Sequence, residues 1–297
     1  MVNSTLSKCL STYSPISLDE MESVKLMNRV DTKYVCHERQ LPAILAAAKE
    51  DYHVQEVAGK RIATYDTVYY DTDELEMYMR HHDQQLTRRK VRIRTYLDTG
   101  AEYLEVKKKN NRGRTKKKRI EIDGNLGCAD SSPSANDLPK GRLTPCPMHG
   151  ITVATGLCPA PVNAQLEKIE QFVSKHTPYE WEKLRATERT AFERITLVNK
   201  EKTERLTMDF HLRFEAIKGD GLEVKGEGKA DLGPIVIIEL KRDGLMPSKM
   251  QHILRDMRIF PMKISKYCIG VAMTIPQVKH NRFKEKLVKL NKLKANS

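Results

Sequence analysis

The chain has 297 residues, of which 39% are hydrophobic and 31% are charged, and its formal net charge is +13. This length suits one large domain or two small ones, and the apolar fraction is low but sufficient for a core. Six scattered cysteines without a CxxC pair disfavour a disulfide framework and a standard zinc site. The positive charge indicates an anionic partner, which could be nucleic acid, a phosphorylated metabolite, a polyanion or an acidic membrane.

The first third of the chain predicts alternating short helices and strands. Residues 1–28 form a polar lead with a short helix in "LDEMESVKLMN", where Asp19 and Glu22 have capping-box spacing. A strand in "RVDTKYVCH" and a helix in "RQLPAILAAAKED" follow. "TYDTVYYDT" predicts a second strand, and "DELEMYMRHHDQ" predicts another short helix.

The stretch from Arg88 to Ile122 is the most basic part of the chain. Its fourteen Lys and Arg residues against four acids give it +10 of the net +13. "DTG" at 98–100 and "NNRG" at 110–113 are turn sequences, so the stretch predicts three antiparallel strands joined by tight loops. Residues 123–163 are rich in Gly, Pro, Ser and Ala, which predicts a flexible insertion.

The last part predicts strands framed by helices. "AQLEKIEQFVSKH" has helical apolar spacing, and strands follow in "ERTAFERITL", "ERLTMDFHLRFEA" and "PIVIIELKRD". "MPSKMQHILRDM" predicts a helix, "KYCIGVAMTI" a closing strand or helix, and residues 276–297 a basic helical tail. No apolar run approaches a membrane span and no secretory signal is visible, so we expect a cytoplasmic protein.

At least five of these strands alternate long charged side chains with apolar ones. One interpretation is an ordinary antiparallel sheet with its charged face in water. The other is a closed sheet whose charged side chains line a water-filled tunnel while helices cover the apolar outside. Cationic faces recur on neighbouring strands, where like charges repel, and "IVIIEL" is apolar on both sides until Glu239, so the second interpretation gains weight.

Eight short segments resemble, in order, a VTC domain, the catalytic domain of vacuolar transporter chaperone polyphosphate polymerases among the triphosphate tunnel metalloenzymes. They are "RVDTKYV", "VRIRTY", "YLEVKKK", "KKKRIEI", "ERTAF", "ERLTMDF", "IIELK" and "KISKYCIGVA". The resemblance is to a stand-alone, bacterial-type version. It implies an α+β fold, an antiparallel eight-stranded closed β-barrel with helices packed outside, over residues 29–275, between the lead 1–28 and the tail 276–297.

The resemblance also implies transfer of the γ-phosphoryl group of ATP to a growing polyphosphate chain, with Mn²⁺ or Mg²⁺ as cofactor. The family's basic site residues match Lys33, Arg92, Arg94, Lys107, Lys117, Arg189, Arg205, Lys263 and Lys266. Its metal-binding glutamate matches Glu239, and Arg119 and Lys241 share the faces of these residues as further substrate-binding candidates. Because Lys116, Lys117 and Lys118 adjoin, the register there rests on alternation with Arg119, which favours Lys117.

Two other functions fit the same residues. A tunnel enzyme that hydrolyses inorganic triphosphate or a nucleoside triphosphate would use nearly the same cations. A non-enzymatic nucleic-acid-binding protein is disfavoured, because aromatics are only 6% and the basic residues have strand spacing. We therefore expect ATP, polyphosphate and orthophosphate as partners and no nucleic acid, with the basic tail as a candidate surface for a protein or the inner face of a membrane.

Overall fold

The computed structural model describes residues 2–22, 29–112, 114–123, 160–217, 228–244 and 247–295. The chain forms two compact units. Unit 1 comprises residues 1–67, 96–99 and 188–297, and unit 2 comprises residues 68–95 and 100–187. Most of the expected insertion at 123–163 lies outside the described residues, although its last four residues belong to a helix.

Three strands contain residues of both units, namely β4 (Ala63–Asp71), β5 (Arg88–Tyr96) and β8 (Arg185–Asn199). Unit 1 also contains α1 (Val2–Ser11), β1 (Pro15–Ile16), α2 (Leu18–Glu22), β2 (Arg29–His37), α3 (Leu41–Ala48), β3 (Tyr52–Gln55), β9 (Glu204–Ala216), β10 (Lys229–Asp231), β11 (Ile235–Asp243), α6 (Lys249–Asp256), α7 (Lys266–Thr274) and α8 (Lys284–Ala295). Unit 2 also contains α4 (Glu76–His82), β6 (Glu102–Lys109), β7 (Thr115–Ile122) and α5 (Ala160–His176).

The strand order along the main path of the sheet is β2-β11-β9-β8-β4-β5-β6-β7. The pairing is antiparallel, as predicted, along β2-β11-β9-β8 and along β5-β6-β7, and β1, β3 and β10 are added outside the path. The path begins at β2 and ends at β7, and no pairing joins these two strands among the described residues. An antiparallel sheet of eight strands with helices is therefore present, but the strand pairing leaves it open where the sequence predicts a closed barrel.

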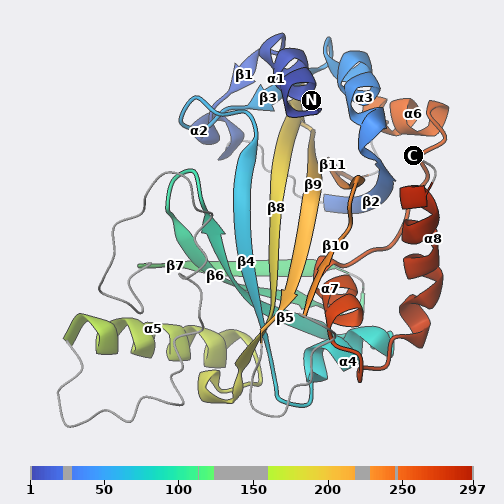
Figure 1. Cartoon of the computed structure of the whole chain (residues 1–297). Helices are drawn as coiled ribbons and strands as arrows, with labels where there is room; N and C mark the ends of the chain where they lie inside the picture. The colour runs from blue at the N-terminus through green and yellow to red at the C-terminus, as the bar shows by residue number, and fades with distance from the viewer. Residues whose placement is uncertain are drawn as a thin grey trace. The chain divides into compact units, whose positions relative to one another are not determined.

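The apolar face of the unit 1 sheet is covered by helices. Figure 1 shows β8, β9 and β11 side by side, with α1, α3 and α6 near one end of these strands. The buried cluster under the helices joins Leu6 of α1, Ile44 of α3 and Leu254 of α6 to Met208 and Ile238 of the sheet. Burial of each such side chain contributes about 1.5–3 kcal/mol, so the apolar face is a genuine core.

The opposite face of this sheet receives α7 and part of α8. Val35 and Ile237 from the strands pack with Ile264, Ile269 of α7 and Leu290 of α8. The segment "KYCIGVAMTI", which the sequence leaves open between strand and helix, is helical, because Ser265 caps it by accepting a hydrogen bond from the Cys268 backbone N–H at 3.2 Å. Helices therefore lie on both faces of unit 1.

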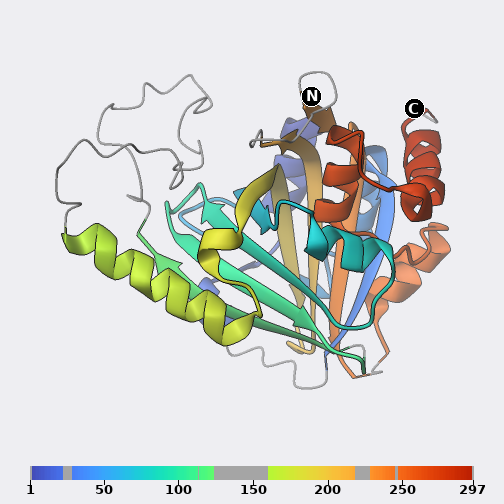
Figure 2. The same cartoon turned by 90° about the horizontal axis from the view of Figure 1, so that it is seen from below.

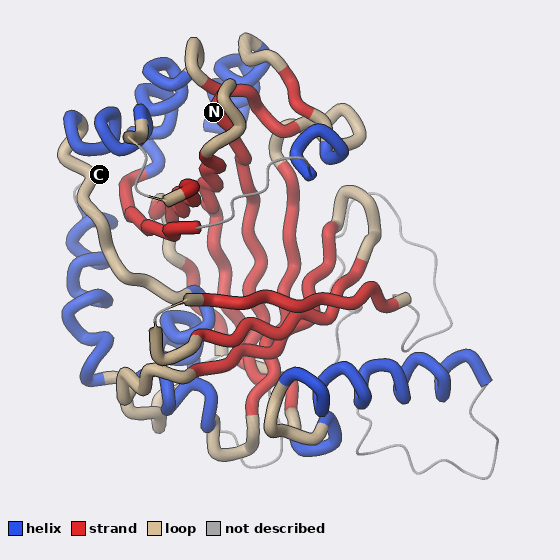
Figure 3. The backbone as a smooth tube through the Cα atoms, turned by 180° about the vertical axis from the view of Figure 1, so that it is seen from behind, coloured by secondary structure: helices blue, strands red, loops and turns tan. Residues whose placement is uncertain are grey.

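Unit 2 contains the predicted three-stranded meander. β5, β6 and β7 follow one another as neighbouring antiparallel strands in the view from behind (Figure 3). Figure 2 shows α5 lying along β6 and β7. Ile169, Phe172 and Val173 of α5 pack there against Leu104 and Ile122. The meander thus has one apolar face that α5 covers.

Two local predictions in the N-terminal lead were wrong. The capping pair of α2 is Ser17 and Glu20 and not Asp19 and Glu22, because the Ser17 Oγ accepts from the Glu20 N–H while the Glu20 carboxylate accepts from the Ser17 N–H at 2.9 Å. The helix α1 was not predicted, since "VNSTLSKCLS" offers only Leu6 and Leu10 as large apolar residues one turn apart.

Gly270 of α7 tests the close packing of this helix on the strands. A Cβ at this position would lie 2.7 Å from Glu188 Oε1 and 2.8 Å from a ring carbon of Phe214. We expect Gly270→Ala to lower the free energy of unfolding by about 1–3 kcal/mol in chemical denaturation, in spite of its better helix propensity. Ala272→Ser on the same helix also adds one heavy atom and should change the free energy by less than about 0.5 kcal/mol. A more stable Gly270→Ala chain would contradict this packing.

Candidate functional site

The face of the unit 1 sheet that receives α7 also carries a row of charged side chains. Glu239 of β11 pairs in register with Lys33 of β2, and Lys241 pairs with Arg205 of β9. Paired residues in neighbouring strands share a face, so these four predicted site residues lie together. The Lys241 Nζ is 3.3 Å from Glu239 Oε2, and both side chains are largely buried.

Farther along the same face, a buried aspartate joins two cations. Asp209 of β9 pairs in register with Arg194 of β8 and is fully buried. The Asp209 Oδ1 accepts a hydrogen bond from Arg194 Nε at 2.5 Å, and its Oδ2 accepts from Arg194 Nη2 at 2.8 Å. Lys266, at the start of α7, donates its Nζ to the same Oδ2. Neither Arg194 nor Asp209 was among the predicted site residues.

Burial and these ion pairs set the charge states of the face. Burial alone would raise the pKa of Asp209, but Arg194 and Lys266 outweigh it and hold the pKa well below its usual range. Burial lowers the pKa of Lys266 to about 8 in spite of Asp209, and lowers that of Lys241 to about 8 in spite of Glu239. Both lysines therefore lose charge just above neutral pH, where an exposed lysine keeps it.

The remaining predicted residues of unit 1 have different surroundings. Arg189 of β8 donates through Nε to Asp66 Oδ2 at 2.7 Å, and this hydrogen bond raises the pKa of Arg189. The Lys33 Nζ donates to the Ile264 carbonyl at 3.1 Å, which ties β2 to the segment before α7. Lys263 lies in that segment and is exposed. The structure therefore brings Lys33, Arg205, Glu239 and Lys241 together by register, whereas Lys263 lies outside this group with its side chain exposed.

The charged face of unit 2 repeats the pattern of a buried carboxylate between cations. Glu105 of β6 is fully buried and pairs in register with Arg92 of β5 and Arg119 of β7. The Arg92 Nε donates to Glu105 Oε2 at 2.8 Å, and the Lys117 Nζ donates to Glu105 Oε1 at 2.8 Å. The Arg92 Nη1 also donates to the Tyr69 hydroxyl at 3.1 Å. Burial alone would raise the pKa of Glu105, but its cationic neighbours hold it well below the usual range.

Register resolves the three adjoining lysines of β7. Lys117 pairs with Lys107 and bonds to Glu105, so it lies on the charged face, while Lys116 and Lys118 lie on the other. Burial lowers the pKa of Lys117, and the attraction of Glu105 offsets this effect only in part. Arg94 is buried and contributes to the low pKa of Glu105. Unit 2 thus brings together the predicted residues Arg92, Arg94, Lys107, Lys117 and Arg119.

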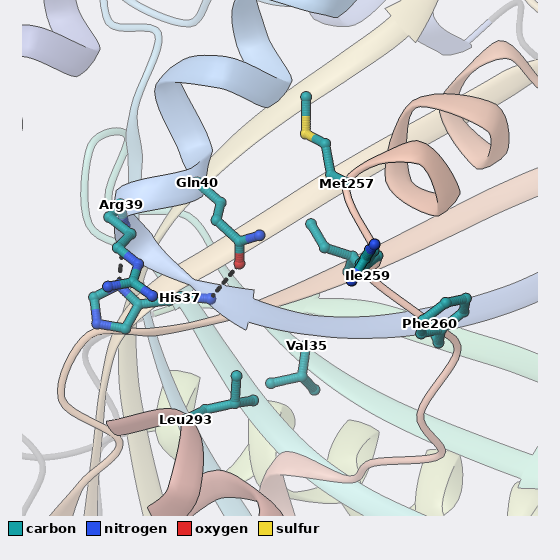
Figure 4. Close-up of a pocket in the computed structure, with 9 residues that line it drawn as sticks. Val35, His37, Arg39, Gln40, Met257, Ile259, Phe260 and Leu293 are labelled. Carbon is teal, nitrogen blue, oxygen red and sulfur yellow. Dashed lines mark hydrogen bonds between the residues drawn. The ribbon is translucent and has the colours of Figure 1, made fainter. Parts of the chain in front are cut away.

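A cavity of about 700 Å³ opens in unit 1 at the end of β2. Figure 4 shows Val35 and Leu293 on one side of the β2 ribbon, with Met257 and Ile259 on the other side. Arg39, Arg258 and Phe260 also line it. It contains none of the predicted site residues, although Val35 follows Lys33 by two positions on the same face of β2.

The described residues contain no group of three or more His, Cys, Asp and Glu side chains that could hold a metal ion by themselves. Glu239 is a largely buried carboxylate on the charged face, and Asp209 on the same face is already bonded to Arg194 and Lys266. Mg²⁺ and Mn²⁺ commonly bind through one or two carboxylates together with substrate phosphates. The donor set therefore fits an ion that a substrate helps to hold, and it does not fit a complete protein cage.

Arg194, Asp209 and Glu105 are the residues that the site prediction left out. Asp209 and Glu105 have strand spacing with the cations of their own strands, which is the sequence signal that could have identified them. Arg194 could not be found this way, because a bulge between Ala191 and Glu193 shifts the register of β8 against β9. In each unit, basic residues on a strand face can attract an anion, and buried carboxylates neutralise part of their charge. These features are typical of a protein that binds a polyanion.

Comparisons with known proteins identify the family. A model of the VTC domain matches residues 28–275, so the chain belongs to the VTC domain family. Among solved structures, the Hippeastrum protein HpAC1, described as having a dominant triphosphatase activity, is 13% identical, with 82% of this chain and 95% of that chain covered and a TM-score of 0.45.

Two further solved structures are similar at lower scores. The PH1819 protein from Pyrococcus horikoshii is 12% identical over 82% of this chain and 98% of that chain, with a TM-score of 0.38. The inorganic triphosphatase NE1496 is 9% identical over 74% of this chain and 81% of that chain, with a TM-score of 0.23. A comparison with curated protein sequences finds no match.

Replacing Glu105 tests whether the buried carboxylate stabilises unit 2. Glu105→Gln leaves Arg92 and Lys117 without their counter-ion, so we expect the free energy of unfolding to fall by about 3 kcal/mol at pH 7. The folded-state pKa of Glu105 lies below its unfolded value, so its stabilisation is complete above about pH 4 and is lost as the pH falls. The difference in the free energy of unfolding between the parent chain and Glu105→Gln, measured by denaturant titration, should therefore become smaller below about pH 4.

Glu121→Gln is the matched control for this prediction. Glu121 lies on the neighbouring strand β7 with its side chain exposed, so its replacement should change the free energy of unfolding by less than about 0.5 kcal/mol. Equal effects of the two substitutions at pH 7 would contradict a stabilising role for the buried carboxylate.

Proposed function

We propose that the chain is a metal-dependent polyphosphate polymerase, which transfers the γ-phosphoryl group of ATP to a growing inorganic polyphosphate chain. A terminal oxygen of the chain forms a bond to the γ-phosphorus. The bond between that phosphorus and the β,γ-bridging oxygen breaks, and ADP leaves. The attacking oxygen is already anionic, so the reaction needs alignment and charge neutralisation more than a strong base.

The observation that carries this proposal is the placement of basic residues at strand spacing on faces that also hold buried carboxylates, within a member of the VTC domain family. Nucleic-acid binding would require no such buried network, because phosphate backbones are contacted from exposed cations. Inorganic phosphate chains, in contrast, offer only anionic oxygens, which suits a lining of Lys and Arg with few aromatics.

Each predicted residue has a role in this proposal. Arg forks bind phosphate oxygens in a bidentate manner and Lys supplies compact charge. Four arginines act on the triphosphate, five lysines add positive potential or hold the acceptor chain, and Arg119 and Lys241 add further substrate contacts. The arginines are Arg92 and Arg94 of unit 2 and Arg189 and Arg205 of unit 1, and the lysines are Lys33, Lys107, Lys117, Lys263 and Lys266. Because Arg92 already donates to Glu105 and Tyr69, it contributes to phosphate binding mainly through its field.

Glu239 is the proposed ligand of the divalent ion, Mn²⁺ or Mg²⁺. When bound, the ion would neutralise charge on the transferred phosphoryl group and on the leaving phosphates. The neighbouring Lys241, at 3.3 Å from the carboxylate, would keep Glu239 on the charged face and balance its charge.

The proposal also includes an eight-stranded tunnel that encloses the phosphate chain. It keeps the expected division of the chain into residues 1–28, 29–275 and 276–297, and it places the protein in the cytoplasm.

The tail is proposed as a secondary docking surface. α8 exposes several lysines, and no described helix is long and apolar enough to span a membrane. Product polyphosphate, an acidic membrane surface or a partner subunit would each suit its charge. Lys289 and Lys294 already form ion pairs with the carboxylates of Glu285 and Asp231, so the available positive charge is smaller than the sequence indicates.

Incubation of the purified chain with ATP and Mn²⁺ separates the proposed reaction from its main alternative, hydrolysis of inorganic or nucleoside triphosphate. We expect long anionic polymer that inorganic polyphosphatase digests, together with ADP. Release of orthophosphate alone would replace the proposal with the triphosphatase reading. If neither polymer nor orthophosphate forms, both the polymerase and the triphosphatase activity are excluded under these conditions.

Glu239→Gln tests the metal assignment. The substitution removes the carboxylate charge and keeps the shape, so we expect metal-dependent turnover to fall by at least about a hundredfold, beyond the roughly ten- to hundredfold loss typical of a residue that only supports a metal ligand. Its circular dichroism spectrum and melting temperature should resemble those of the parent chain. Retained activity at saturating Mn²⁺ would refute this role of Glu239.

A further inference from the structure

Arg194, Asp209 and Lys266 form a closed network in the interior of unit 1. The carboxylate of Asp209 accepts hydrogen bonds from both cations, and Arg194 occupies both of its oxygens. Two positive groups and one negative group leave a net charge of about +1 in this network, if all three are ionised. Only Lys266 belongs to the residues that match the family's basic site residues.

Aromatic rings confine the two cations. The guanidinium of Arg194 lies over the rings of Tyr65 and Phe192 at 4.8 and 5.2 Å from their centroids. The Lys266 Nζ lies over the same Phe192 ring at 4.9 Å. Cation–π contact adds to the ion pairs, so both cations have defined positions. Arg194 is therefore committed to Asp209, while Lys266 has one carboxylate contact and further donor hydrogens.

We propose that Asp209, which Arg194 locks in place, is a positioning residue that holds the ammonium of Lys266 on the charged face for a bound phosphate chain. This inference rests on the proposed function, because a phosphate ligand for Lys266 exists only there. Asp209 would not touch the substrate itself. It would act through Lys266, as a fixed counter-ion that makes a buried lysine available as a cation.

The electrostatics of Lys266 agree with this role. Burial lowers its pKa to about 8, Asp209 opposes that effect, and the positive charges of Arg194 from β8 and Lys33 from β2 add to it. Removal of the Asp209 charge should therefore lower the pKa of Lys266 further. Removal of the Arg194 charge should raise it, because repulsion ends and Asp209 pairs with Lys266 alone.

Unit 2 contains an independent example of the same design. Glu105 is fully buried between Arg92, which donates through two nitrogens, and Lys117, which is the most exposed member of the group. In both units a buried carboxylate holds an arginine and a lysine, and in both the lysine donates to one oxygen of that carboxylate. The recurrence indicates that this arrangement is a general means of presenting lysines on these faces.

The test uses the full chain, lysine labelled with ¹³C at the ε-carbon, and NMR titration from pH 6.5 to 10. The Lys266 signal is identified by its loss in Lys266→Arg. We expect a midpoint near 8 in the parent chain, a midpoint at least about one pH unit lower in Asp209→Asn and a higher one in Arg194→Met. A lower Lys266 midpoint in Asp209→Asn together with a higher one in Arg194→Met cannot come from a general loss of protein stability, which would not shift the midpoint in opposite directions. Unchanged midpoints in both variants would overturn the inference.

Binding of inorganic triphosphate without metal, measured by calorimetry at pH 8, supplies the functional readout. A midpoint about one unit lower leaves Lys266 mostly neutral, so Asp209→Asn should bind several-fold to tenfold more weakly than the parent chain. If Asp209→Asn does not fold, Arg194→Met carries the test, because Lys266 still neutralises Asp209 in it. We expect weaker binding there too, since the network then has no net charge.

Glu204→Gln is the matched control. Glu204 is another buried carboxylate on β9, but its partners include the Tyr52 hydroxyl, Ser248 and Arg242, away from the charged face. This variant should change neither the Lys266 midpoint nor triphosphate binding. A parent chain that does not bind triphosphate would contradict the proposed function. Normal binding by the parent chain together with equal binding by Asp209→Asn would contradict the inference alone.

Discussion

The structure depends on the pairing of buried carboxylates with cations inside a sheet that carries a large excess of positive charge. Like charges on neighbouring strands repel, and a buried unpaired charge is costly. Glu105 and Asp209 meet both demands, because each is fully buried and accepts hydrogen bonds from an arginine and a lysine. The stretch from Arg88 to Ile122 can therefore fold as strands in spite of its charge of +10.

This pairing also organises the proposed site. Neutralising every cation would remove the attraction for an anion, while neutralising none would prevent folding. Each carboxylate instead leaves its network with one net positive charge, and the helices on the opposite, apolar faces supply the stability of the fold. Glu239 beside Lys241 is a third acid–base contact on the same kind of face, and there the carboxylate keeps some exposure, unlike Glu105 and Asp209, which suits a role toward a metal ion.

Much of the fold could be predicted from the sequence. Strand alternation and turn sequences gave β2, the meander and β9 with nearly correct ends, because these signals are local. The family resemblance predicted a closed sheet, but the described strand path ends at β2 and β7, because closure depends on long-range pairing that local sequence signals do not specify. The sequence pattern also misplaced the cap of α2, where Ser17 and Glu20 compete with a similar pair two residues on. Arg194 was missed because a bulge in the pairing of β8 with β9 interrupts the register around it.

A crystal structure with inorganic triphosphate would show whether the charged faces bind phosphate. We expect phosphate oxygens within hydrogen-bond distance of the cations on these faces, Lys33, Arg205 and Lys266 among them, while Asp209 stays bonded to Arg194. Triphosphate bound only to the exposed lysines of α8, with both charged faces free of it, would exclude a phosphate-binding role for these faces.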